Sequence, residues 1–270
     1  MIKRFFQDLN ISGVSYMLIS GQASVIYGAA TFSEDIDLWV QPVKENWNRF
    51  LKVLGSVGAV IYKLTPPISM KWISQGHGFH FQIPDEDKNI PFWFLDVMGV
   101  APRVGDYDDS FKRVKYPMTD WGKIPVVAIR DLVEIKKTRR LEDYPIISNL
   151  VRIESRNLSE RKLKMNDWKW ILKNSFEVED ILDYLQSDET AKTIGAHLSR
   201  KCLSLCLQAL LQDHRKAVHL KEASQEMALE IEESRRRDRI YWAPIIDELK
   251  VLKKNNRLLV PGNKPPRMVA

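Results

Sequence analysis

Between Pro145 and Pro244 the chain contains no proline, and this stretch limits what the second half can form. Proline usually ends or kinks a helix, so its absence is compatible with a succession of helices. Apolar residues recur at helical spacing after about Ile129, with almost no strand pattern. The predicted helices cover residues 131–140, 144–152, 168–185, 191–211, 217–237 and 242–254. We therefore expect an all-helical C-terminal region that ends in a frayed tail from Pro261.

The first half has a different pattern, in which short apolar runs are mixed with helical stretches. A helix is expected over residues 22–27, and another where Trp47, Phe50 and Leu54 form an apolar stripe. The predicted strands cover residues 14–19, 36–40, 79–83 and 92–97, and the last two are expected to form a hairpin. The pattern indicates an α/β (α+β) fold with a mixed sheet and flanking helices. We expect two domains, a catalytic one over residues 1–155 and a basic helical one over residues 156–270.

The composition of the 270 residues is that of an ordinary globular protein, with 44% hydrophobic and 28% charged residues. It excludes disordered, collagen-like and disulfide-stapled classes. No apolar run is long enough to span a bilayer, and the first residues lack the apolar region of a signal peptide. We therefore expect a soluble, cytoplasmic protein with no membrane partner. The two cysteines, Cys202 and Cys206, lie in an apolar stretch and are expected to be buried core thiols.

The net charge of +6 is unevenly distributed along the chain. Residues 1–150 carry an excess of +1, and residues 151–270 carry an excess of +5. This distribution favours a polyanionic partner for the second half, although solvated helix faces also carry such charge. The basic run from Arg235 to Arg239 has two interpretations, a surface for RNA phosphates or a solvated helix end.

The segment over residues 18–40 carries the pattern that is most informative about chemistry. A strand runs into Ser20 and Gly21, a helix begins at once, and Asp35 and Asp37 follow in an apolar strand. The strand period of two places both carboxylates on one face. Two neighbouring acids repel each other, and a divalent cation such as Mg²⁺ or Mn²⁺ relieves that repulsion. Gly21 lets a phosphate approach the backbone, and the start of a helix presents N–H groups to an anion.

A third acid is expected on a neighbouring strand, because two-metal phosphoryl transfer needs one site for the attacking oxygen and one for the leaving phosphate. Asp96 is the only acid in the apolar run from Pro91 to Pro102. Placed beside Asp37, it completes the metal site and can accept the proton of an acceptor hydroxyl. Taken singly, an acid pair is often solvated and a Ser-Gly pair is often only a turn. Their order along the chain favours an active site.

This arrangement resembles the DNA-polymerase-β-like nucleotidyltransferase superfamily, in particular its small bacterial AbiE-type and MNT-like members. The resemblance covers roughly residues 12–150 and rests on the phosphate turn followed by Asp-Ile-Asp. It implies that Asp35, Asp37 and Asp96 are catalytic and bind two Mg²⁺ or Mn²⁺ ions. The implied substrate is an NTP such as ATP, from which NMP passes to an acceptor hydroxyl with release of pyrophosphate.

The resemblance also implies a set of residues that bind the nucleotide. A later stretch is similar to the family's helix, because Lys136, Arg140 and Asp143 follow one another at helical spacing. The lysine can meet the β- and γ-phosphates, and the arginine can brace the phosphates or Asp143. The nucleotide-binding residues are thus expected to be Ser20, Gly21, Ser24, Lys136 and Arg140.

The implied setting is a toxin–antitoxin or antiviral (phage) defence system. The acceptor is then an RNA such as tRNA, a nucleotide oligomer or a protein, and a cognate antitoxin or defence protein is the expected partner. The alternative is a catalytically silent nucleic-acid-binding or protein-interaction subunit of such a system. His77 and His80 flank an aromatic strand without a third ligand, a pattern more typical of packing or of a substrate rim.

Overall fold

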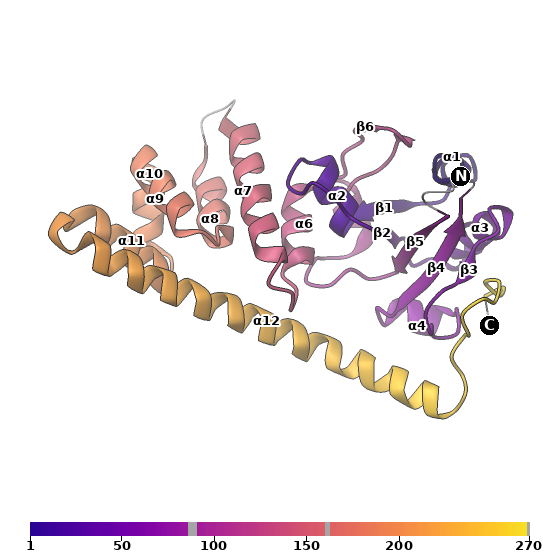
Figure 1. Cartoon of the computed structure of the whole chain (residues 1–270). Helices are drawn as coiled ribbons and strands as arrows, with labels where there is room; N and C mark the ends of the chain where they lie inside the picture. Colours follow the sequence, from indigo (N-terminus) through magenta and orange to yellow (C-terminus); the bar gives the residue numbers. More distant parts are fainter. Residues whose placement is uncertain (86–90, 160–162, 269–270) are drawn as a thin grey trace. The chain divides into compact units, whose positions relative to one another are not determined.

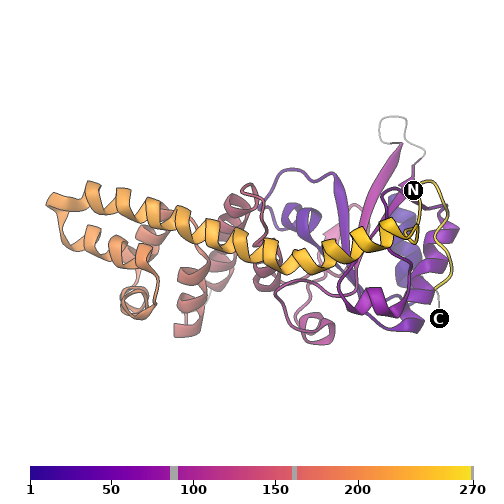
Figure 2. The ribbon, with the colours of Figure 1, turned by 90° about the horizontal axis from the view of Figure 1, so that it is seen from below.

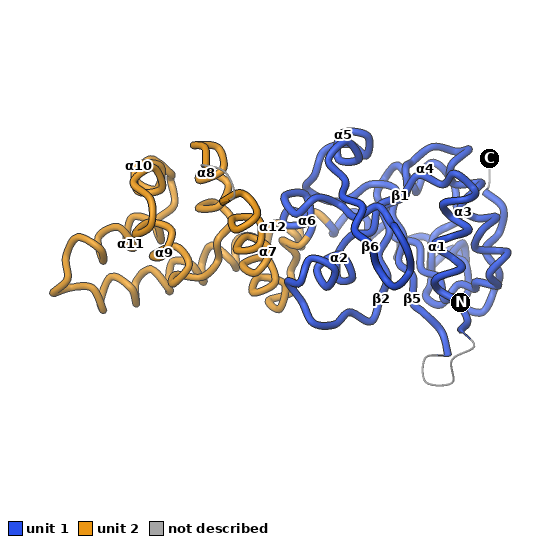
Figure 3. Tube along the Cα trace, turned by 90° about the horizontal axis from the view of Figure 1, so that it is seen from above, with its two compact units in different colours: residues 1–135, 242–270 blue, residues 136–241 orange. Residues whose placement is uncertain are grey.

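The computed structural model describes residues 1–85, 91–159 and 163–268 and divides into two compact units (Figure 3). Unit 1 comprises residues 1–135 and 242–270, and unit 2 comprises residues 136–241. The sequence pattern placed the division at residues 155/156 instead, which lies inside the continuous helix α7 (Asp143–Ser159). The difference arises because periodicity shows where helices form and does not show which elements pack together. The functional roles expected for the two regions remain predictions.

A five-stranded mixed sheet forms the centre of unit 1 and confirms the predicted fold class (Figure 1). β2 and β5 run parallel, whereas the other neighbouring pairs, including the predicted β4–β5 pair, are antiparallel. In spatial order the strands are β1 (Tyr16–Ile19), β2 (Asp35–Val40), β5 (Phe92–Met98), β4 (Gly78–Pro84) and β3 (Val60–Ile61). A separate ribbon consists of β6 (Met118–Thr119) and β7 (Gly122–Lys123). The helices described in unit 1 include α1 (Ile2–Ile11), α2 (Ser20–Ile26), α3 (Lys44–Ser56), α4 (Met70–Ser74), α5 (Tyr107–Phe111) and most of α6 (Ile129–Lys136).

The two faces of this sheet differ because its central strands alternate apolar and polar residues. Trp47 of α3 lies edge-on to Phe79 of β4, with 5.1 Å between the ring centroids, so α3 covers the apolar face. The other face is partly exposed and carries the polar residues of the same strands. The fully buried side chains of the apolar face include Ile36, Leu38, Phe79, Phe81, Leu95 and Val97.

The C-terminal segment pairs with the edge of this sheet. The amide of Ile61 in β3 donates to the carbonyl of Asn263 at 2.9 Å, and the amide of Gly262 donates to the carbonyl of Ile61 at 2.8 Å. This segment is the yellow end of the chain in Figure 2. The expectation of a tail frayed from Pro261 is therefore wrong for these residues. An edge strand offers free backbone groups, and pairing with them requires no apolar side-chain pattern that a sequence could reveal.

Unit 2 is all-helical, as predicted, but two of its expected long helices are broken. Residues 168–185 form parts of α8 (Met165–Asn174) and α9 (Val178–Ser187), and residues 191–211 form α10 (Glu189–His197) and α11 (Lys201–Leu211). A short 3₁₀ turn, η1 (Asp213–Arg215), follows. Conversely, the expected helices 217–237 and 242–254 are one helix, α12 (Lys216–Lys254), which continues through Pro244. Pro244 has no N–H, so the carbonyl of Ile240, four residues earlier, lacks its helical hydrogen bond. Ile240 is 58% exposed, so this carbonyl is not buried without a partner.

Both cysteines are buried free thiols, as predicted, and burial raises the pKa of Cys202 to about 12 and that of Cys206 to about 11. No helix within the described ranges combines the length and the hydropathy that crossing a membrane requires.

Arg200 binds the backbone at the break between α8 and α9. Its guanidinium donates to the carbonyls of Leu172 and Ser175 at 2.5 and 2.7 Å, and its Nε donates to Glu230 at 2.6 Å. Carbonyls in the last turn of a helix lack intrahelical donors, so this side chain satisfies groups that the break leaves open. The Arg200 side chain is 10% exposed, so water has little access to replace it.

We expect Arg200→Ala to lower the free energy of unfolding by about 2–4 kcal/mol, because it leaves buried carbonyls and Glu230 without their donor. The measurement is denaturant unfolding followed by far-UV circular dichroism. Lys201→Ala is the matched control, because the Lys201 side chain is 69% exposed and removal of its ion pair should cost less than about 1 kcal/mol. Equal losses in the two variants would contradict the structural role given to Arg200.

Candidate functional site

The two strands that carry the predicted acids are adjacent and parallel. Asp37 of β2 is the direct Cα partner of Asp96 of β5, and Asp35 is the partner of Phe94. Ile36, which lies between the two acids of β2, and its cross-strand partner Leu95 each have 0% exposure. Since successive strand residues point to opposite faces, all three carboxylates lie on the partly exposed face of the sheet. The structure therefore places on one face an acid pair, Asp35 and Asp37, and a third acid that follows about 60 residues later in the chain.

The carboxylate of Asp96 contacts two side chains of unit 1, Tyr62, which follows β3, and His80 of β4. Tyr62 Oη donates to Asp96 Oδ1 at 2.9 Å, and His80 Nδ1 lies 2.8 Å from the same oxygen. His80 is the direct partner of Asp96 across the β4–β5 pair. Burial raises the pKa of Asp96, but the hydrogen bond and charge of His80, the charge of Lys63 and the Tyr62 hydrogen bond together lower it below its usual range. Asp96 is thus an ionised acceptor at neutral pH.

Tyr62 lies within the electric field of the whole acid group. Its pKa is raised, first by burial and then by Asp96, with further contributions from Asp35 and Asp37. The ring lies 4.6 Å from that of Phe94 between centroids, and the ammonium of Lys63 lies 4.5 Å from the Tyr62 ring centroid. These contacts hold a protonated hydroxyl among three carboxylates.

The donor set of this face fits a hard divalent cation, because Mg²⁺ and Mn²⁺ prefer carboxylate oxygens. The strand register brings the backbones of Asp37 and Asp96 side by side, and Asp35 lies on the same face. Over residues 1–85, 91–159 and 163–268, however, no three His, Cys, Asp or Glu side chains meet closely enough to hold a metal ion. The three acids share a face without converging on one point, so ion binding would require their side chains to turn toward one another.

The predicted phosphate turn lies where β1 runs into α2. Ser20 has φ 58°, a left-handed conformation that is uncommon for residues other than glycine. The hydroxyl of Ser24 is buried and donates to the carbonyl of Ser20 at 2.9 Å, so it stabilises the turn in this conformation. Strained backbone at a turn beside polar residues is common at binding sites. The roles of these serines toward a triphosphate remain predictions.

Gly21 lies so close to the Ser33 side chain that a Cβ atom at this position would overlap it. A Cβ atom at this position would lie 2.1 Å from Ser33 Oγ and 2.9 Å from Ser33 Cβ. Ser33 belongs to the loop that leads to the acids, and its carbonyl accepts from Gln22 Nε2 at 2.7 Å. The close approach expected of a phosphate at Gly21 is therefore made, in this structure, by the Ser33 side chain. This contact pins the loop before β2 against the start of α2.

We expect Gly21→Ala to lower the free energy of unfolding by about 1–3 kcal/mol, because the new methyl group overlaps Ser33. Adding Ser33→Gly removes both overlapping atoms and should restore most of the loss. Thermal unfolding of the two variants and the wild type measures the effect. If the double variant is no more stable than Gly21→Ala, the contact with Ser33 is not the reason for this glycine.

Lys136 and Arg140 lie in unit 2, where both pair with Asp143. Lys136 Nζ lies 2.9 Å from Asp143 Oδ1, and Arg140 Nε lies 3.0 Å from Asp143 Oδ2. The lysine and the aspartate are 4% and 3% exposed, whereas the arginine is 61% exposed. The three side chains meet, but not on one helix as expected: α6 ends at Lys136, α7 begins at Asp143, and Arg140 lies in the connection between them. Their predicted role toward a nucleotide remains a prediction, and in this conformation the buried lysine neutralises a buried carboxylate.

The basic run near the end of unit 2 is balanced by acids on the same helix. Arg236 and Arg237 both donate to Glu233, at 2.6 to 2.9 Å, and these bonds lower the pKa of Glu233 to about 2. Arg235 and Arg239 pair with Glu232. This pairing favours the solvated-helix interpretation of the run over a surface that holds RNA phosphates.

Sequence reasoning did not find Tyr62 and assigned His80 to packing or a substrate rim. Tyr62 follows the short strand β3, and no motif marks it. A signal for His80 was present, since the predicted hairpin pairs residues 79–83 with the strand of Asp96. Only the register shows that His80 is the direct partner of the acid.

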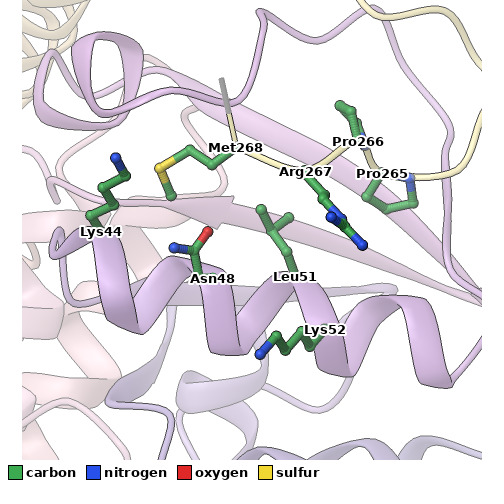
Figure 4. A pocket seen from close by; sticks show the side chains of 8 residues that line it. All are labelled: Lys44, Asn48, Leu51, Lys52, Pro265, Pro266, Arg267 and Met268. Carbon is green, nitrogen blue, oxygen red and sulfur yellow. The ribbon is translucent and has the colours of Figure 1, made fainter. Parts of the chain in front are cut away.

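A basic pocket lies elsewhere in unit 1, between α3 and the C-terminal segment (Figure 4). It has a volume of about 650 Å³, and its cationic side chains are Lys44, Lys52 and Arg267. Because α3 covers the apolar face of the sheet, this pocket is not part of the acid site on the other face.

No family profile and no curated protein matches the chain. Solved structures that match include a nucleotidyltransferase candidate from Thermotoga maritima, at 16% identity over 59% of this chain and 91% of that chain, with a TM-score of 0.35. Another is an antigenic nucleotidyltransferase-like protein from Paracoccidioides brasiliensis, at 12% identity over 64% of this chain and 91% of that chain, with a TM-score of 0.36. TM-scores of this size carry no activity over to this chain.

Proposed function

We propose that the protein is a metal-dependent nucleotidyltransferase that transfers NMP from an NTP to an acceptor hydroxyl and releases pyrophosphate. The observation that carries this proposal is the pairing of Asp37 with Asp96 on adjacent parallel strands, with Asp35 on the same face. Three carboxylates side by side are costly to maintain unless a cation or a reaction uses them. The resemblance of the Ser-Gly turn and the Asp-Ile-Asp strand to nucleotidyltransferases supports the same reaction.

In this proposal the three acids share one task and Asp96 has a second. Asp35, Asp37 and Asp96 would hold the cations, and Asp96 would also take the proton of the acceptor hydroxyl, for which its ionised state suits it. Bound Mg²⁺ or Mn²⁺ would neutralise charge on the triphosphate and polarise the α-phosphoryl group. The turn at Ser20 and Gly21 would lie along the triphosphate. His80 and Tyr62 orient the carboxylate of Asp96 through their contacts with Oδ1.

The acceptor and the setting are proposed from the resemblance and from charge. An RNA such as tRNA, a nucleotide oligomer or a protein would offer the hydroxyl, and the excess of +5 in residues 151–270 favours an anionic acceptor. A toxin–antitoxin or phage-defence role, with a cognate partner protein, is the setting that the resemblance implies.

The test is incubation of the purified chain with each α-labelled NTP, Mg²⁺ or Mn²⁺, and total cellular RNA or protein. We expect label in one of these fractions, with pyrophosphate released in equal amount, and no label from γ-labelled NTP. Release of pyrophosphate without label in any macromolecule, or no reaction with any NTP, would contradict the proposed transfer.

A catalytically silent binding subunit is the second candidate. It is favoured by the finding that, in the described ranges, no three side chains of the ligating types meet at one point. Titration with Mn²⁺, followed by its paramagnetic resonance signal, separates the two candidates. The transferase predicts Mn²⁺ binding that weakens in Asp35→Asn, whereas the silent subunit predicts no binding while RNA or protein binding persists.

A further inference from the structure

The hydroxyl of Tyr62 is already bound to the carboxylate that would accept the proton in the proposed reaction. Tyr62 Oη donates to Asp96 Oδ1 at 2.9 Å, which is the contact that an acceptor hydroxyl must make before it loses its proton. The side chain is only half-buried, so a nucleotide bound at the acids can reach it. The chain therefore presents an oxygen nucleophile of its own to the acid site.

The position of this hydroxyl is fixed by contacts on several sides. The Tyr62 ring lies against the rings of Phe94 and His80, with centroids at 4.6 and 5.9 Å. Its backbone amide donates to the carbonyl of His80 at 3.2 Å. Because β4 and β5 hold both His80 and Asp96, the hydroxyl and the acid are carried by one framework. A nucleophile held in place in this way needs little reorganisation before attack.

Other tyrosines of unit 1 donate to amide or backbone carbonyl oxygens. Tyr16 Oη donates to the amide oxygen of Asn10 at 3.0 Å, and Tyr27 Oη donates to the carbonyl of Val127 at 2.8 Å. Tyr62 differs from them because its acceptor is a carboxylate oxygen, a group of the kind that serves as a general base.

We propose that Tyr62 is a self-modification site, at which the protein transfers a nucleoside monophosphate to its own phenolic hydroxyl. This inference rests on the proposed nucleotidyltransferase function and names a phenol as an acceptor. Tyr62 Oη forms a bond to the α-phosphorus of the NTP, and its proton passes to Asp96 Oδ1. The bond from that phosphorus to the oxygen bridging the β-phosphate breaks, and pyrophosphate leaves with the electron pair. The product is a phosphodiester on Tyr62.

The experiment uses the full chain with each α-labelled NTP and Mg²⁺ or Mn²⁺, in parallel reactions with and without cellular RNA and protein. Label on the chain is separated from label on the added acceptors, and peptide mass spectrometry locates the modified residue. We expect one nucleotidyl group on the peptide that contains Tyr62. Tyr62→Phe keeps the ring and its packing but should abolish this label. Tyr116→Phe, at a tyrosine that is 48% exposed, should keep it.

Two results overturn self-modification at Tyr62 while leaving the proposed function intact: label on an added acceptor with none on the chain, and label on a residue of the chain other than Tyr62. Absence of both label and pyrophosphate release in every reaction overturns the proposed function and this inference together. Mapping of the wild-type chain needs no variant, so the test stands even if Tyr62→Phe is poorly folded.

Discussion

Replacing Asp96 by asparagine is expected to reduce transfer of labelled α-phosphate by about 10³-fold or more, because the variant keeps the shape of the side chain but cannot accept a proton. Asparagine still offers an oxygen to Tyr62 or His80, so the fold should survive. Asp35→Ala should abolish transfer to the same extent by removing one of the proposed cation ligands. Initial rates with the reactive NTP, together with thermal unfolding of each variant, measure both effects.

Asp120→Asn is the matched control, because this acid is exposed and lies between β6 and β7, on neither of the strands that carry the three acids. It should keep the wild-type rate. The melting temperatures of the site variants should stay near that of the wild type, since removing one of several neighbouring negative charges relieves their repulsion. Wild-type activity in Asp96→Asn or in Asp35→Ala, with normal melting, would eliminate the proposed active site.

The second large effect concerns stability and comes from Asp143→Asn in unit 2. Lys136 and Asp143 are 4% and 3% exposed and lie 2.9 Å apart, so removing the carboxylate leaves a buried ammonium without its partner. Breaking a buried ion pair on one side typically costs about 3–5 kcal/mol. We expect a loss of that size in the free energy of unfolding, measured by denaturant titration at neutral pH. The exposed pair of Lys250 with Asp247 supplies the control, and Asp247→Asn should cost less than about 1 kcal/mol.

The stability loss expected for Asp143→Asn should depend on pH, because Asp143 is a titratable group. Burial raises the pKa of Asp143, but Lys136, the Thr138 hydroxyl and Arg140 outweigh burial and lower it below its usual range. A lowered pKa in the folded state contributes stability that is present above the unfolded pKa, near 4, and is lost as the pH falls through the folded pKa. The stability difference between wild type and Asp143→Asn should therefore shrink on acidification below about pH 4. A difference that stays constant down to the lowest pH would show that the ion pair is not its source.

Much of the acid site could be predicted before any fold was known. The period of two put Asp35 and Asp37 on one face, and the apolar run around Asp96 marked it as a strand acid; the structure places all three on one sheet face. The partners of Asp96 could not be predicted, because Tyr62 and His80 reach it through strand register. A short edge strand such as β3 leaves too weak a pattern to reveal that register.

In the helical half, too, the sequence pattern predicted some features and tertiary contacts decided others. Its helical character followed from apolar spacing, but the carbonyls at the break after Asn174 are satisfied by Arg200, a residue distant in the chain. Local pattern determined that the first half mixes strands and helices, that the second half is helical and that Asp35 and Asp37 share a face, because those properties depend on neighbours one to four residues away. Only the tertiary structure decided that Asp37 lies beside Asp96, that the C-terminal segment joins β3 and that Ser33 excludes a side chain at Gly21. These contacts join residues that are distant in the chain or meet across a loop, and their geometry depends on how whole elements pack.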